Sequence, residues 1–147
     1  MPRYVLDTNL YITADRDADW GEEMSRFLSS HLPSIYLHGV VAQELLAGAL
    51  DLRREKLVRD NLIAPFERRG RTIVPSFSTW ARAGQIASKL VQRKLLSPGG
   101  FKRSFMNDCV LAASCRAEGL TLITLNRADF ELIGRVEPID VVLPWPD

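Results

Sequence analysis

The chain has 147 residues, of which 46% are hydrophobic and 25% charged, and its net charge is +1, a composition typical of globular proteins. A net charge so close to zero excludes a protein that binds nucleic acid through its overall charge, so any basic patch must be local. No apolar run approaches the ~20 residues of a membrane span, and no basic-then-apolar leader opens the chain. We therefore expect one domain, residues 1–147, with no membrane association.

Cys109 and Cys115 are the only cysteines of the sequence and fall on one predicted helix. Their Cα atoms would be about 9 Å apart along the helix axis. That separation is too long for a disulfide. We therefore expect two reduced thiols in the core and a cytoplasmic protein.

The first segment with a clear prediction is residues 4–6, a short apolar run typical of a buried strand in a parallel sheet. Asp7 follows this run directly and would stand at the carboxyl end of the strand, the edge where open α/β sheets bind ligands. A carboxylate at that place is costly unless it is paired or binds a metal ion. Asp7 is therefore the first candidate site residue.

Predicted helices and strands alternate along the rest of the chain. Asp19 and Glu22 have the spacing of a helix start of the capping-box kind. Further strands are predicted at residues 35–37, 72–74, 121–124 and 139–142, and helices at residues 40–50, 51–69, 78–96 and 105–118, with a short helix opened by Asn126. We expect Trp80 on the core side of its helix. Strands repeatedly separated by helices indicate a three-layer α/β/α sandwich with a mainly parallel sheet of about five strands.

Three acidic residues besides Asp7 are candidates for a site. Glu44 and Asp108 have mostly apolar or small neighbours one helical turn away, and Asp129 opens a short helix after the fourth predicted strand. Each also has a structural alternative. Glu44 could pair with an arginine, Asp108 could favour the helix dipole, and Asp129 could cap its own helix through Asn126. Most other acids, among them Glu118 and Glu137, are expected on the surface.

The predicted topology brings the four acids to one edge of the sheet. Asp7 and Asp129 follow strands that end there, and Glu44 and Asp108 lie near the starts of helices that open there. Converging carboxylates repel one another and take up protons unless a cation holds them. Because no His or Cys is predicted beside these oxygen ligands, the set favours Mg²⁺ or Mn²⁺ over zinc.

Four segments, in order along nearly the whole chain, resemble the PIN-domain pattern, and most of all VapC-type toxins of bacterial toxin–antitoxin systems. They are residues 5–9 (VLDTN), 41–45 (VAQEL), 107–113 (NDCVLAA) and 124–130 (TLNRADF). The resemblance implies a PIN-like sandwich and a Mg²⁺- or Mn²⁺-dependent endoribonuclease that cuts structured RNA such as tRNA or rRNA. It also implies a homodimer that is neutralised by a VapB-type antitoxin.

The same resemblance assigns roles to individual side chains. It implies a catalytic and metal-binding set of Asp7, Glu44, Asp108 and Asp129, supported by the polar groups Asn9, Thr124 and Asn126. One departure is visible, because His38 and Gly39 stand where the family commonly shows a Ser or Thr cap before the Glu44 helix. This departure concerns the stability of that helix rather than the chemistry.

Basic residues near the predicted acids are candidates for RNA binding. Lys102 and Arg103 precede the Asp108 helix, and Arg127 is close to Asp129, although solvated helix faces are the alternative for each. Surface or packing roles are expected for His31 and His38, and core or interface roles for Trp20, Trp80 and Trp145. Apolar residues at 24–28 and 45–52 are candidates for a groove that binds an antitoxin helix.

Two other functions fit parts of the pattern. A PIN-like module without catalytic activity would bind a partner, but the presence of all four acids argues against it. A phosphatase or phosphoacceptor domain would use Asp7 as its nucleophile. Against that function, Asn9 stands where haloacid-dehalogenase-like phosphatases carry a second carboxylate.

Overall fold

A parallel sheet of five strands, in the order β3-β2-β1-β4-β5, forms the centre of the computed structural model, which describes residues 2–99 and 101–147. The strands are β1 (Tyr4–Leu6), β2 (Ile35–His38), β3 (Thr72–Ile73), β4 (Thr121–Ile123) and β5 (Asp140–Val142). Every pair of neighbouring strands is parallel. The predicted α/β class, strand count and strand direction are confirmed.

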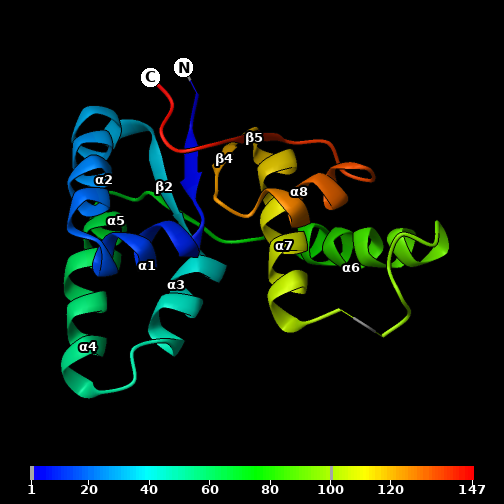
Figure 1. The fold of residues 1–147 in the computed structure, drawn as a ribbon, viewed down its shortest axis with the longest axis horizontal. Coiled ribbons are helices and arrows are strands. Elements are labelled where there is room, and N and C mark those ends of the chain that lie inside the picture. The colour runs from blue at the N-terminus through cyan, green and yellow to red at the C-terminus, as the bar shows by residue number, and fades with distance from the viewer. Residues whose placement is uncertain (1, 100) are drawn as a thin grey trace.

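Helices cover the sheet on both sides, so the predicted three-layer sandwich is also confirmed (Figure 1). They are α1 (Thr8–Arg16), α2 (Ala18–His31), α3 (Gly39–Ala47), α4 (Leu52–Leu57), α5 (Ala64–Arg68), α6 (Phe77–Gln92), α7 (Arg103–Glu118) and α8 (Arg127–Gly134). A short 3-10 turn, η1 (Leu32–Ser34), precedes β2, and a π-helical segment, η2 (Val58–Ile63), joins α4 to α5. Within the described residues, no helix is long and apolar enough to cross a membrane.

The central strands are buried on both faces, as expected for parallel strands between helical layers. Val5 and Leu6 of β1 are at most 1% exposed, and Leu122 and Ile123 of β4 are fully buried. The register pairs Val5 with Leu122 and Leu6 with Ile123, so β1 and β4 end together. The residues that follow these strands therefore meet at one edge of the sheet.

The first helix was missed in the sequence, and the predicted start of the second is wrong. α1 begins at Thr8, directly after β1, because Asp7 is extended and its side chain accepts a hydrogen bond from the Thr8 backbone N–H. α2 begins before Asp19, and Asp17 is its N-cap, accepting from the Trp20 backbone N–H at 3.1 Å. The sequence of α1 shows no clear apolar face, because this helix buries little besides Leu10 and Tyr11.

Two predicted side-chain positions are also wrong. Trp80 is 52% exposed, because α6 turns Ala83, Ile86 and Leu90 to the core instead. Glu137 is buried at 6% exposure, where it pairs with Arg82 and lies 3.9 Å from Arg116. Ion pairing with residues distant in sequence explains how this carboxylate leaves the surface.

Gly119 ends α7 with a φ of 66°, a left-handed conformation that glycine adopts without strain. The predictions for the cysteines and for two of the tryptophans are confirmed. Cys109 and Cys115 are buried free thiols. Trp20 and Trp145 pack on each other with ring centroids 5.7 Å apart, next to the core.

Candidate active site

Asp7 is held at the carboxyl end of β1 by hydrogen bonds to both of its carboxylate oxygens. It is 5% exposed. Its Oδ1 accepts from the Thr8 backbone N–H at 2.8 Å, and its Oδ2 accepts from the Thr124 hydroxyl at 2.7 Å. The Asn9 amide also donates to Oδ2, at 3.4 Å. Asp7 is therefore fixed in orientation by two groups from the start of α1 and by the hydroxyl of the residue that follows β4.

Asp108 and Asp129 are joined by a single amide group. Asp108 lies on α7 and is 8% exposed, and Asp129 lies in the first turn of α8. The Asn126 Nδ2 donates to Asp108 Oδ2 at 3.2 Å and to Asp129 Oδ2 at 3.0 Å. Asn126 is in turn tied to Thr124, whose hydroxyl accepts from the Asn126 backbone N–H at 2.9 Å. Residues 5–9 and residues 124–130, the first and fourth segments of the PIN-like pattern, thus belong to one hydrogen-bond network.

Glu44 completes the cluster from α3. The Thr8 hydroxyl donates to Glu44 Oε1 at 2.7 Å, and the Asn107 amide donates to Oε2 at 3.4 Å. Thr8 is adjacent to Asp7 in sequence, and Asn107 is adjacent to Asp108. The structure therefore brings all four predicted acids together. Thr8 and Asn107 were not identified as site residues from the sequence, where the only signal was their position beside an acid.

The environment of these carboxylates opposes their ionisation. Burial raises the pKa of Asp7 from its usual range, opposed by the hydrogen bonds from Thr124 and Thr8, and the charge of Glu44 raises it further. Burial also raises the pKa of Asp108, to about 8, with further increases from the charges of Asp7, Asp129 and Glu44. Without a cation, Asp108 therefore holds a proton at neutral pH.

The donor atoms suit a hard divalent cation. All are carboxylate or amide oxygens, the ligands preferred by Mg²⁺ and Mn²⁺. The Asn9 Oδ1 is buried and finds no hydrogen-bond partner in residues 2–99 and 101–147. Within the same residues, however, no three acidic, histidine or cysteine side chains are close enough to ligate one ion as they stand. Binding an ion would therefore require these side chains to draw together.

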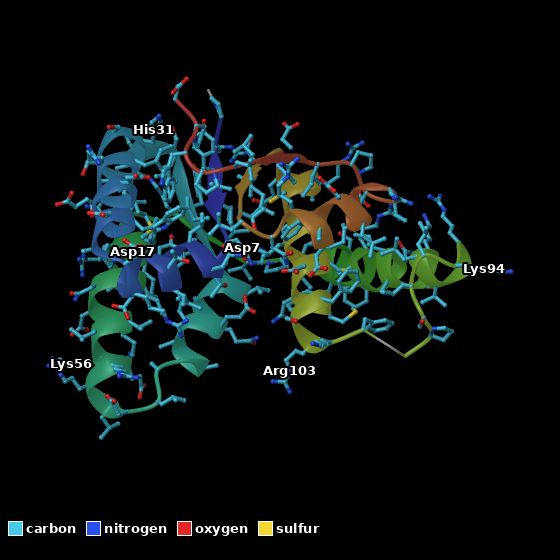
Figure 2. The ribbon with its side chains drawn as sticks, viewed as in Figure 1. Asp7, Asp17, His31, Lys56, Lys94 and Arg103 are labelled. Atoms are coloured by element: carbon cyan, nitrogen blue, oxygen red, sulfur yellow. The ribbon has the colours of Figure 1, made fainter. Side chains whose placement is uncertain are left out.

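The predicted RNA-binding residues are exposed at helix starts. Lys102 is the N-cap residue of α7 and Arg103 its first residue, at the outer end of the helix (Figure 2). Arg127 is the first residue of α8, and its guanidinium lies 3.5 Å from Glu131. All three are exposed, and only Arg127 follows directly on a residue of the acidic network.

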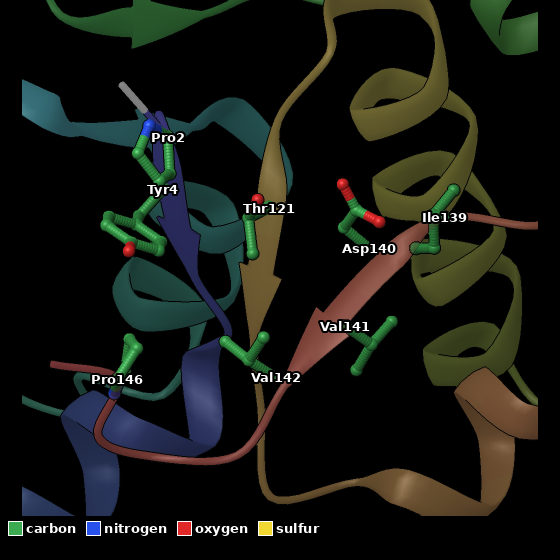
Figure 3. A pocket seen from close by; sticks show the side chains of 8 residues that line it. All are labelled: Pro2, Tyr4, Thr121, Ile139, Asp140, Val141, Val142 and Pro146. Carbon is green, nitrogen blue, oxygen red and sulfur yellow. The ribbon is translucent and has the colours of Figure 1, made fainter.

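A separate cavity lies away from the acids, between the sheet and the C-terminal segment (Figure 3). Its volume is about 410 Å³. It is lined by Pro2, Tyr4, Thr121, Ile139, Asp140, Val141, Val142 and Pro146. Because it contains a single carboxylate and no histidine or cysteine, it offers no alternative metal site or catalytic group.

Comparisons with known proteins identify the family and the fold of the chain. The model of the PIN domain family matches residues 4–136. A chain of the DNA-bound VapBC structure from Salmonella typhimurium superposes with a TM-score of 0.72 at 21% identity, over 97% of this chain and 98% of that one. A chain of FitAcB from Neisseria gonorrhoeae superposes with a TM-score of 0.68 at 23% identity, over 97% of this chain and 98% of that one.

A chain of FitAB bound to an IR36 DNA fragment gives a TM-score of 0.69 at 24% identity, over 98% of this chain and 96% of that one. No curated protein matches the sequence. At these identities the solved structures establish the shared fold, whereas the family model spans nearly all of the sheet and every acid of the cluster. The chain belongs to the PIN domain family.

Proposed function

We propose that this protein is a metal-dependent endoribonuclease, a VapC-type toxin that hydrolyses phosphodiester bonds in structured RNA such as tRNA or rRNA. The observation that carries the proposal is the cluster of four carboxylates, in which burial and like charges raise the pKa of Asp108 to about 8. Such a cluster is destabilising unless it serves a cation. Membership of the PIN family and the fold shared with VapBC and FitAB chains support the same function.

The roles of the side chains follow from their places in the cluster. Asp7, Asp108 and Asp129 would hold Mg²⁺ or Mn²⁺, and Glu44 would orient the attacking water or share a second ion. A bound divalent ion would activate water and neutralise charge on the phosphate. Thr124 and Asn126 keep the carboxylates in fixed orientations through the hydrogen bonds described above.

An RNA-cleavage assay on purified protein tests this function. We expect a tRNA transcript to be cleaved with Mn²⁺ or Mg²⁺ and left intact with EDTA. Asp7→Asn should reduce cleavage by about a hundredfold or more, because it removes a charged ligand of the proposed ion. Removing a group that only orients such a ligand by a hydrogen bond already costs about 10–100-fold in metal affinity or activity. Asp60→Asn, which changes an exposed acid of η2, is the matched control. Cleavage that persists in EDTA, or in Asp7→Asn at the wild-type rate, contradicts the proposal.

Lys102, Arg103 and Arg127 are proposed to contact RNA phosphates beside the acidic cluster. Replacing all three by alanine should weaken RNA binding. The slope of log K against the logarithm of salt concentration should become shallower by up to about one unit for each lost phosphate contact. Filter binding over a range of salt concentrations measures both quantities. Arg26→Ala, an exposed arginine of α2, is the control and should leave the slope unchanged. An unchanged slope in the triple variant removes these residues from the RNA interface.

An antitoxin of the VapB type is proposed as the partner that silences the enzyme. Of the two apolar segments predicted to form its groove, residues 24–28 do not offer Met24 and Phe27, which are buried at 7% and 5% exposure. The other predicted segment, residues 45–52, offers Leu50 and Leu52, which are 82% and 84% exposed at the connection between α3 and α4. We place the antitoxin helix on these two leucines. Co-expression of both chains, followed by measurement of RNA cleavage by the purified complex, tests whether the antitoxin silences the enzyme.

A homodimer is proposed for the active protein. Val74 and Phe77 are 79% and 89% exposed, and Trp80, near them on α6, is 52% exposed. An apolar surface of this kind is typical of an interface. We expect Phe77→Asp to give a monomer in light scattering, whereas Leu143→Asp, at another exposed leucine, should keep the wild-type mass. A wild-type mass equal to that of one chain contradicts the homodimer.

A further inference from the structure

His38 is a polar side chain that is fully buried between two helices of the site. It ends β2 and is 0% exposed. Its Nδ1 lies 3.0 Å from the backbone nitrogen of Val40, in the first turn of α3, and its Nε2 lies 2.8 Å from the hydroxyl of Ser114 on α7. The imidazole therefore connects the helix that carries Glu44 with the helix that carries Asp108.

The direction of each hydrogen bond follows from the donors. The Val40 backbone N–H can only donate, so Nδ1 is the acceptor and the ring proton lies on Nε2. Nε2–H then donates to the Ser114 hydroxyl, which donates in turn to the Val110 carbonyl at 2.8 Å. Burial lowers the pKa of His38 to about 4, so the ring stays neutral at physiological pH. Every polar atom of this chain of contacts is satisfied.

A histidine provides a contact that a shorter capping residue cannot. Ser or Thr at position 38 would cap α3 with its hydroxyl, but that hydroxyl would be engaged near its own backbone. The imidazole caps α3 through Nδ1 and still reaches Ser114, which is 76 residues away in sequence, through Nε2. The departure from the common Ser or Thr therefore replaces a local cap with a cap that also joins two helices.

We propose that His38 is a positioning residue that couples α3 to α7 and so sets the distance between Glu44 and Asp108 for metal binding. The inference rests on the proposed function, because it assigns the two carboxylates to one metal site. Glu44 lies within two turns of the His38 cap, and Asp108 lies within two turns of Ser114. A change in how α3 packs against α7 is therefore passed directly to both carboxylates.

Calorimetric titration of the full-length protein with Mn²⁺ tests the coupling without reference to RNA cleavage. Ser114→Ala removes the link and keeps the α3 cap, and His38→Ser keeps a capping hydroxyl while removing the link. We expect each variant to bind Mn²⁺ about tenfold more weakly. This is the lower end of the loss in metal affinity that follows when a group supporting the metal ligands is removed. The double variant should be no weaker than His38→Ser alone, because both changes break the same contact.

Thr79→Ala is the matched control, a buried hydroxyl of α6 that bonds to Ser76 away from the acids. A purely structural role for His38 predicts that Ser114→Ala lowers the melting temperature as Thr79→Ala does and leaves Mn²⁺ affinity unchanged. That result would overturn the inference. Wild-type protein that binds Mn²⁺ but does not cleave RNA would instead overturn the nuclease function and leave the coupling measurable.

Discussion

Asp108→Asn is expected to abolish RNA cleavage and, at the same time, to raise the melting temperature of the metal-free protein. Asparagine has the shape of the carboxylate and keeps an oxygen that can accept from the Asn126 amide, so the fold should be retained. Cleavage should fall by about a hundredfold or more, because a proposed ligand of the ion is lost. The gain in stability has a separate cause in the charges that surround this position.

The folded wild type must keep Asp108 protonated at neutral pH, whereas the unfolded chain ionises it with a pKa near 3.8. This difference stabilises the unfolded state, and asparagine removes it. A gain of ~1 kcal/mol would raise the melting temperature of a domain of this size by about 4 °C. Thermal melts in EDTA, paired with cleavage assays in Mn²⁺, measure both effects.

Asp60→Asn controls for the loss of a negative charge and should change neither quantity. A lower melting temperature for Asp108→Asn in EDTA would show that the carboxylate is stabilising in the absence of metal. Cleavage at the wild-type rate would show that Asp108 is not a ligand. Opposite signs for stability and activity are therefore the signature of a site that destabilises its own fold.

Mn²⁺ affinity should rise about fiftyfold between pH 6 and pH 8. The ion competes with the proton on Asp108, whose pKa is raised to about 8, so one displaced proton gives about a tenfold change for each pH unit below that value. The raised pKa of Asp7 acts in the same direction. Calorimetry in two buffers of different ionisation enthalpy measures the protons released, and a pH-independent affinity would contradict the prediction.

Asp108 and His38 make opposite contributions to how the free energy of unfolding depends on pH in EDTA. Folded Asp108 keeps a proton that the unfolded chain loses above pH 3.8, so its contribution falls as the pH rises toward 8. His38 acts in the opposite sense, because its folded pKa is about 4 and its unfolded pKa 6.5, so its contribution rises with pH between these values. Between pH 6.5 and 8 the His38 effect is complete while the Asp108 effect continues, so the melting temperature should fall.

Sequence reasoning could locate the acids because topology determines their convergence. Once residues 4–6 and 121–123 are recognised as parallel strands, Asp7 and Thr124 must follow them at the same edge of the sheet. Glu44 and Asp108 could be placed by the apolar neighbours on their helices. These inferences need only local sequence patterns and the direction of the strands. The positions of the four acids could therefore be predicted without knowing any long-range contact.

The remaining features depend on contacts that no local pattern reveals. α1 is polar on its surface, and its start is determined by the hydrogen bond from Thr8 to Asp7. The burial of Glu137 depends on Arg82, which is 55 residues away in sequence. The role of His38 depends on Ser114 in the same way. Such pairings become visible only when the helices are placed against one another.

The amide of Asn126 has a consequence for how the proposed metal site would take up an ion. It lies between Asp108 and Asp129 and already neutralises part of their repulsion by donating to both. An ion shared by the two carboxylates would bind their remaining oxygens while the amide holds one oxygen of each, in keeping with its proposed orienting role. The two carboxylates would then be positioned relative to each other before any ion arrives.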